Sequence, residues 1–295
     1  MAKQKNRSYL LILAAMIWGL AFVFQKDASN FIGTFTFTSI RFFLGALSLI
    51  PVILIFERQD FADKIIMSNT LKYGIVTGIM LGIASSLQQY SMKIINYPTK
   101  VAFITGLYTV LVPVFGFFIG KKTRLNVWIS AFIAVLGLYF ISFAGDSDIG
   151  AGEVVAFIGT IFWTFHILCI SKFVEKVSPL KFSFVQFLTA SVLNGLCALV
   201  FEHGGFSMAN IIAAGIPILY TGIMSSGIAY TLQVIGQKNA NPAQAAIFLS
   251  AEALFSTIGF AVLHHEIMPL DSYIGCALIF IGIILSQIEF KSKNT

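Results

Sequence analysis

Hydrophobic residues fill ten long runs of this 295-residue chain, and short polar segments separate the runs. Each run approaches the ~20 residues that a helix needs to cross about 30 Å of hydrocarbon. The runs are continuously apolar rather than alternating, which favours helices over the strands of a membrane barrel. We therefore predict an all-α integral membrane protein with ten transmembrane helices. The predicted spans are roughly 9–24, 34–56, 71–90, 99–119, 125–144, 152–171, 180–201, 213–234, 243–263 and 270–290.

The two halves of the chain resemble each other at a constant spacing of about 145 residues. The matched positions include Trp18 and Trp163, Gln88 and Gln233, Lys93 and Lys238, Phe103 and Phe248, and Gly137 and Gly282. One offset that recurs along both halves indicates a duplication. Five spans per copy place the second copy upside down in the membrane. We predict two inverted five-helix repeats, residues 1–145 and 146–295, an architecture typical of secondary transporters.

The charges give the predicted orientation. If the N-terminus is cytoplasmic, nearly all Lys and Arg residues lie on the inner side, and only Lys26, Lys93 and Lys100 lie outside. The positive-inside rule then places both termini in the cytoplasm. A composition of 57% hydrophobic and 11% charged residues leaves too little polar surface for a soluble globule of this length.

Several other classes of protein lack support in the sequence. The net charge of +6 is dispersed between apolar runs, so we expect no nucleic-acid partner. Three isolated cysteines inside apolar runs predict buried free thiols: Cys169, Cys197 and Cys276. His264, His265 and Glu266 lack the spacing of a metal motif, and no nucleotide-binding or nucleophile motif occurs. We predict no metal, no cofactor and no enzymatic activity.

Two ionisable residues inside the spans are the first candidates for function, Arg41 in the second span and Glu252 in the ninth. A charge at this depth costs roughly 2.5 to 3.5 kcal/mol on insertion scales, so it normally faces a bundle interior or an aqueous cavity. They could handle a substrate or a proton, or pair with each other or with polar neighbours to hold the halves together. Their counterparts in the other repeat are Gln186 and Leu107, so the two charges break the symmetry of the repeats.

A polar and aromatic set surrounds these charges in the pattern. Its members are Trp18, Gln88, Gln89, Tyr108, Trp163, His166, Gln186, Tyr230 and Gln233. Indoles and amides of this kind can bind an amino or carboxylate group and stack against a ring. Interhelical hydrogen bonding or interfacial anchoring is the alternative for each member, and packing is the ordinary role of a lone His166.

Small residues and prolines mark candidate gating positions. Gly78 and Gly222 belong to ridges of small residues at four-residue spacing, which allow close helix contact. Such contacts serve either static packing or sliding during gating. Pro113 and Pro217 lie inside the fourth and eighth spans, where a proline produces a hinge or a fixed bend.

The chain resembles the EamA-type carriers of the drug/metabolite transporter superfamily over nearly its whole length. The resemblance lies in Trp18-Gly19 followed by Phe22, in Arg41-Phe42, in the tract ending at Gly120, and in Glu252 and Glu266. It implies a ten-helix bundle of the cell membrane, with a central cavity, that moves amino acids or related metabolites, often outward. Ala253 replaces the proline of many relatives, and Lys121 stands where the first repeat often has an acidic residue.

Our hypothesis from the sequence is a secondary carrier of small organic metabolites, with amino acids favoured, that exports its substrate by alternating access. Arg41 would hold an anionic group or close the outer side. Glu252 would bind a cation or carry a coupling proton, and Trp18, Trp163 and Tyr230 would shape the cavity. The alternatives are an intramembrane lipid-modifying enzyme, a non-transporting receptor and a passive channel.

Overall fold

The computed structural model describes residues 8–57, 63–95, 97–142, 149–202, 207–238, 240–263 and 269–288. These residues form helices and no strand. Nine helical segments are long and apolar enough to span a membrane, and a shorter apolar helix, Leu125–Ile141, is the tenth. The predicted all-α bundle of ten spans is therefore confirmed. The cluster His264, His265 and Glu266 lies outside the described residues.

Seven spans are single helices. They are α1 (Ser8–Ala28), α2 (Thr34–Phe56), α3 (Lys64–Ile94), α6 (Leu125–Ser142), α7 (Ala151–Phe173), α8 (Pro179–Phe201) and α14 (Leu270–Gln287). Helix α3 is longer than the apolar run from 71 to 90, because it begins at Lys64, where Asp63 caps the first turn by accepting hydrogen bonds from the amides of Ile65 and Ile66. Two short elements lie between spans, the 3-10 turn η2 (Val174–Lys176) and α9 (Met208–Ala213).

The other three spans are interrupted. The fourth consists of α4 (Pro98–Gly106) and α5 (Tyr108–Phe118), and the ninth of α12 (Pro242–Leu249) and α13 (Ala251–Leu263). The residues at the interruptions, Leu107 and Ser250, have nearly the same backbone angles, with φ of −61° and −63° and ψ of −12° in both. Each interruption is a tightened turn rather than an unfolded gap. Such turns inside a helix often mark functional hinges.

The eighth span contains α10 (Gly215–Leu219), a π-helical segment η3 (Tyr220–Ala229) and α11 (Tyr230–Gln237). Its counterpart, α3, is a regular α-helix, and the π segment accounts for a shift of register between them. Gly78 and Gly222 occupy equivalent places, since one packs against Gln186 and the other against Arg41, and they are 144 residues apart. After the π segment the spacing is again 145, at Gln88 and Gln233.

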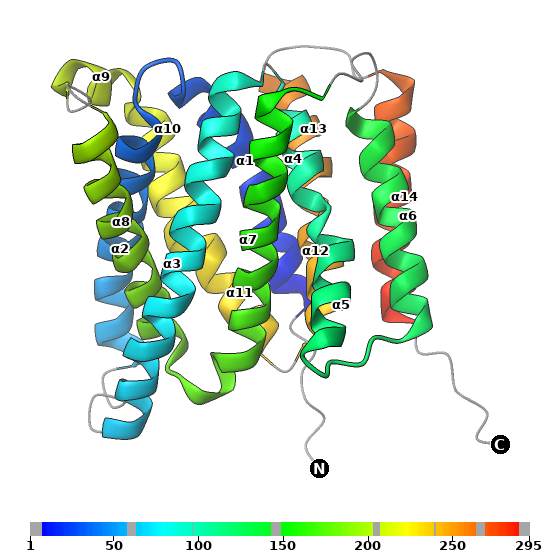
Figure 1. Cartoon of the computed structure of the whole chain (residues 1–295), viewed down its shortest axis with the longest axis horizontal. Helices are drawn as coiled ribbons and strands as arrows, with labels where there is room; N and C mark the ends of the chain where they lie inside the picture. The colour runs from blue at the N-terminus through cyan, green and yellow to red at the C-terminus, as the bar shows by residue number, and fades with distance from the viewer. Residues whose placement is uncertain are drawn as a thin grey trace.

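Helices related by the repeat pack in antiparallel pairs. Helix α2 packs against α8, and α6 packs against α14 at the other edge of the molecule (Figure 1). The pseudo-twofold relation is visible in side chains, because Phe42 and Phe187, 145 residues apart, stack with ring centroids 6.0 Å apart. Helices α1 and α7 are also related by the repeat. Helix α1 packs against α13, helix α7 packs against α3, and both line the centre of the bundle.

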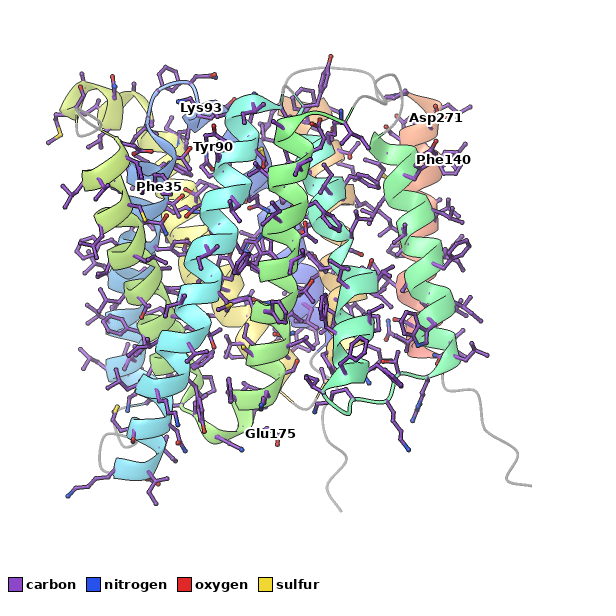
Figure 2. All side chains as sticks on the ribbon, in the orientation of Figure 1. Phe35, Tyr90, Lys93, Phe140, Glu175 and Asp271 are labelled. Carbon is purple, nitrogen blue, oxygen red and sulfur yellow. The ribbon has the colours of Figure 1, made fainter. Side chains whose placement is uncertain are left out.

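The two ends of the bundle can be distinguished by the chain. Helix α1 begins and α14 ends at the same end of the molecule (Figure 1). Figure 2 places Glu175 at this near end and Phe35, Tyr90 and Lys93 at the far end. The cytoplasmic location of the near end remains a prediction from the charge distribution.

Candidate functional site

A small cavity lies at the centre of the bundle, between the two repeats. Its volume is about 20 Å³, enough for about one water molecule. Eight of the predicted site residues line it: Trp18, Arg41, Gln88, Tyr108, Trp163, Tyr230, Gln233 and Glu252. Six further residues complete the wall: Phe22, Gln25, Thr105, Ile167, Ser225 and Leu249. The structure thus brings most of the candidate set together from seven of the ten spans.

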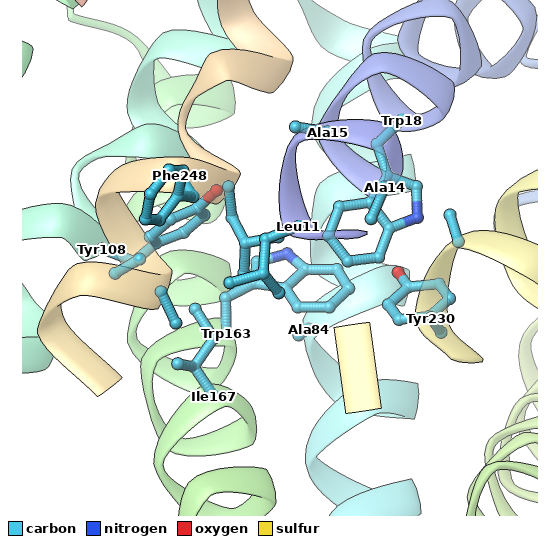
Figure 3. Packing of buried hydrophobic residues seen from close by; sticks show 14 of the residues in the cluster. Leu11, Ala14, Ala15, Trp18, Ala84, Tyr108, Trp163, Ile167, Tyr230 and Phe248 are labelled. Atoms are coloured by element: carbon cyan, nitrogen blue, oxygen red, sulfur yellow. The ribbon is translucent and has the colours of Figure 1, made fainter. Parts of the chain in front are cut away.

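Three aromatic side chains converge in the middle of this cavity. Trp18 from α1, Trp163 from α7 and Tyr230 from α11 approach one another in Figure 3. The ring centroid of Tyr230 is 4.6 Å from that of Trp18 and 6.0 Å from that of Trp163, and the latter pair is stacked. The indole N–H of Trp18 donates to the carbonyl of Ser225 at 3.2 Å, whereas that of Trp163 has no hydrogen-bond partner among the described residues.

Glu252 enters the cavity directly after the tightened turn at Ser250. Its side chain is buried, and Oε1 accepts a hydrogen bond of 2.9 Å from the hydroxyl of Tyr108. Tyr108 follows the corresponding turn at Leu107, so the two interrupted spans place these partners opposite each other. A carboxylate at this depth whose hydrogen-bond partner is a neutral hydroxyl keeps most of its hydrogen-bonding capacity for another ligand.

Arg41 supplies the positive charge from the third turn of α2. It is 1% exposed, and Nη1 donates to Oε1 of Gln25 at 3.0 Å. The guanidinium carbon lies 4.8 Å from the ring centroid of Phe42, a cation–π distance. Its Nε and Nη2 atoms have no hydrogen-bond partner among the described residues. Arg41 and Glu252 therefore contact different partners rather than each other, and two guanidinium donors remain available.

Of the remaining predicted polar residues, Gln88 and Gln233 line the cavity and His166 lies behind its wall. Gln88 donates to the hydroxyl of Thr105 at 3.1 Å, and the amide oxygen of Gln233 has no hydrogen-bond partner among the described residues. His166 does not line the cavity, and its Nε2 lies 3.1 Å from Oε1 of Gln186. Its ring packs edge-on against Trp163 and Tyr230 and so forms the layer behind the cavity wall.

The predicted gating residues occupy helix contacts and helix interiors. A Cβ atom on Gly78 would lie 2.7 Å from the carbonyl oxygen of Gln186, and one on Gly222 would lie 2.8 Å from Cβ of Leu44. Both glycines thus allow close approach of α3 or η3 to the α2 and α8 pair. Pro113 lies within α5 and Pro217 within α10, and neither coincides with the interruptions at Leu107 and Ser250. Their part in gating stays a prediction.

Gln25 is the important wall residue that sequence reasoning missed. The predicted first span ended at Phe24, but α1 continues to Ala28 and carries Gln25 inward to Arg41. Gln89, next to the predicted Gln88, donates to the carbonyl of Gln25 at 3.0 Å and holds this part of α1. An amide one residue beyond an apolar run gives a weak signal, because interfacial residues of this kind are common.

Comparison with known proteins places this architecture in a family. The model of the EamA-like transporter family matches the chain twice, over residues 7–143 and 150–287. The chain belongs to the EamA-like transporter family. It is 27% identical to an uncharacterized transporter of Archaeoglobus fulgidus, over 95% of this chain and 85% of that protein. It is 21% identical to the uncharacterized transporter YoaV of Bacillus subtilis, over 96% of this chain and 97% of that protein.

A solved structure has the same fold as this member of the EamA-like family. The two superpose with a TM-score of 0.78 at 18% sequence identity, and the match covers 97% of each chain. This likeness concerns the fold alone. The family matches and the ten spans identify a multi-pass transporter of the cell membrane.

Proposed function

We propose that this transporter is a secondary carrier that exports amino acids or closely related zwitterionic metabolites by alternating access. The observation that carries the proposal is the presence of a guanidinium and a carboxyl group in one small, aromatic-lined cavity. Arg41 and Glu252 each have a neutral hydrogen-bond partner, Gln25 and Tyr108, rather than each other. A zwitterion carries both charges on one small molecule, so it can satisfy a guanidinium and a carboxylate at once.

The proposed roles follow from the free hydrogen-bonding groups. The unpaired Nε and Nη2 of Arg41 bind the substrate carboxylate as a fork. Glu252 binds the ammonium group of the substrate, or a proton when the substrate is absent. Either ligand replaces the hydrogen bond from the hydroxyl of Tyr108. The rings of Trp163 and Tyr230 contact the substrate side chain, since stacked aromatic rings favour alkyl and aromatic groups.

The small cavity supports a mechanism in which the helices move. About 20 Å³ accommodates roughly one water molecule, and an amino acid is several times larger. Binding therefore requires helices around the cavity to part on one side of it at a time. The tightened turns at Leu107 and Ser250 directly adjoin the wall residues Tyr108 and Leu249 and are the proposed positions of bending.

Counterflow in proteoliposomes tests the proposal. Vesicles loaded with a pool of amino acids are challenged with single labelled members, and wild type is compared with Glu252→Gln. We expect saturable uptake in wild type and a loss of at least about tenfold in the variant, because the amide cannot neutralise an ammonium group. Imposed pH gradients of both signs report proton coupling and direction.

Glu175→Gln is the matched control, because this substitution makes the same chemical change at an exposed position of η2 outside the cavity. It should leave counterflow unchanged. Uptake that does not saturate would indicate a channel. Absence of exchange for every amino acid, with folded protein, would refute the proposed substrate class.

A further inference from the structure

The far end of helix α2 is capped by a residue of the other repeat. Its N-cap residue, Gly33, has no side chain, and yet the first free amides are bonded. Oε1 of Glu202 accepts from the amide of Phe35 at 2.8 Å, and Oε2 accepts from the amide of Thr36 at 2.9 Å and from its hydroxyl at 2.7 Å. Glu202 is itself the C-cap residue of α8.

The near end of helix α8 shows the same arrangement with the roles exchanged. Glu57, the C-cap residue of α2, accepts from the amides of Leu180 at 3.0 Å and Lys181 at 3.1 Å. Its Oε2 also accepts from the hydroxyl of Ser178. Each of the two antiparallel helices therefore ends in a carboxylate that caps the beginning of the other.

The two caps obey the repeat register. Glu57 and Glu202 are 145 residues apart, as are Phe35 and Leu180, and Thr36 and Lys181. A helix leaves its first four amides unbonded, and its N-terminus favours a negative charge, whereas its C-terminus disfavours one. A glutamate at the end of α2 or α8 is thus unfavourable for its own helix and favourable for its partner. The contact therefore acts between the repeats.

Local packing is adapted to this contact. A Cβ atom on Gly33 would lie 2.3 Å from Oε2 of Glu202, so only glycine leaves room for the carboxylate at the far end. Between the two caps, nearer the far end, Ser39 donates to the carbonyl of Ser191 at 2.9 Å, and Ser191 donates to the carbonyl of Ser39 at 3.0 Å. The pair is therefore bonded at both ends and between them.

We propose that these reciprocal caps make α2 and α8 one rigid body that stays intact throughout the transport cycle. Both caps are closed in a single conformation, at opposite ends of the membrane, so neither alternates with the other. Sliding or splaying of the pair would break charge-assisted hydrogen bonds at both ends. Glu57 and Glu202 are then positioning residues, since they fix the height of Arg41 on α2 and of Gln186 on α8. The inference requires a carrier, but it does not depend on amino acids being the substrate.

Hydrogen exchange on the wild-type protein tests whether the caps stay closed. The amides of Phe35, Thr36, Leu180 and Lys181 precede the intrahelical bonds, so only the carboxylates protect them. We expect slow exchange at both sites in reconstituted protein. Rapid exchange at either site would show that its cap opens during the cycle and would overturn the proposal.

Single variants assign the protection to each carboxylate. Glu202→Gln should accelerate exchange at Phe35 and Thr36 by about tenfold and leave Leu180 and Lys181 unchanged. Glu57→Gln should have the reverse effect, so each variant is the matched control for the other. Acceleration at both sites in either variant would indicate general loosening rather than two separate caps.

A reversible cross-link tests the rigid body directly. The hydroxyl oxygens of Ser39 and Ser191 are 3.5 Å apart, close enough for a disulfide when both are replaced by cysteine in a chain whose three native cysteines are alanine. The oxidised protein should exchange a pool of labelled amino acids as fast as the reduced protein. If Glu202→Gln slows amino-acid exchange, the same cross-link should restore it, because the covalent bond replaces the lost cap.

Loss of amino-acid exchange on oxidation, reversed by reductant, would show that α2 and α8 must separate and would overturn the proposal. Absence of exchange in the wild type would instead refute the amino-acid substrate, and hydrogen exchange would still decide whether the caps remain closed.

Discussion

At the scale of single residues, Arg41 has the clearest unused hydrogen-bonding capacity in the cavity. Two of its guanidinium nitrogens lack a hydrogen-bond partner among the described residues, although the side chain is 1% exposed. Burial without partners is unfavourable for a charged group unless a ligand or water supplies the bonds. A useful test therefore changes the planar geometry of the guanidinium and keeps its positive charge.

We predict that Arg41→Lys keeps transport but weakens substrate binding. Lysine retains the charge and loses the planar fork that binds a carboxylate through two bonds. Loss of one charge-assisted hydrogen bond is worth about 1.5–3 kcal/mol, or roughly a ten- to hundredfold increase in KM. The concentration dependence of counterflow measures this change, with the exposed Arg124→Lys as control. An unchanged KM would assign the unpaired nitrogens to packing.

The charged residues of the site could be found in the sequence, because a charge at bilayer depth is costly and conspicuous. Arg41 and Glu252 stand out in this way, and Trp18 and Trp163 stand out through the repeat. The reciprocal caps of Glu57 and Glu202 were present in the same register and were missed. Glutamates at the ends of apolar runs are ordinary, and only the antiparallel packing of α2 and α8 shows what they bind.

At the scale of helices, apolar runs predicted ten spans but not their interruptions. Hydropathy does not report a tightened turn, because Leu107 and Ser250 keep a helical backbone within continuous apolar segments. The hydroxyl of Ser250 bonds the carbonyl of Ile247 at 2.8 Å, a local contact that any serine in a helix can make. The π segment of the eighth span likewise leaves only a one-residue shift of register.

The contact between α6 and α14 depends on glycine. A Cβ atom on Gly275 would lie 2.4 Å from the carbonyl oxygen of Gly137, and Gly282 meets Ser130, the counterpart of Gly275, in the mirrored contact. We predict that Gly275→Ala lowers the stability of the folded protein by about 1–3 kcal/mol through overpacking. Thermal unfolding in detergent measures this loss.

Gly215→Ala is the control for this change, because a Cβ atom there has nothing within 4 Å. Neither α6 nor α14 contributes a residue to the cavity wall. The folded fraction of Gly275→Ala should therefore transport at the wild-type rate. A variant as stable as wild type would show that the two helices can separate without cost.

At the scale of the whole molecule, the two ends of the bundle are closed differently. Nζ of Lys100 on α4 lies 2.8 Å from Oε1 of Glu153 on α7, at the far end. The positions related to them by the repeat are Ala245 and Ser8, which carry no charge. This ion pair therefore has no equivalent at the near end, and the symmetry of the fold is broken where access must be controlled.

The ion pair joins two helices that both contribute to the cavity wall, through Thr105 and Trp163. We expect opening of the far end to part α4 and α7, whereas the proposed rigid pair of α2 and α8 stays together. We predict that Lys100→Cys with Glu153→Cys, joined by a short bifunctional thiol reagent, stops counterflow. The oxidised Ser39 and Ser191 cysteine pair should leave it unchanged. Cross-linking a pair of cysteines at each of two interfaces thus distinguishes helices that move from helices that stay fixed. Full transport by the cross-linked α4 and α7 pair would place the opening elsewhere in the bundle.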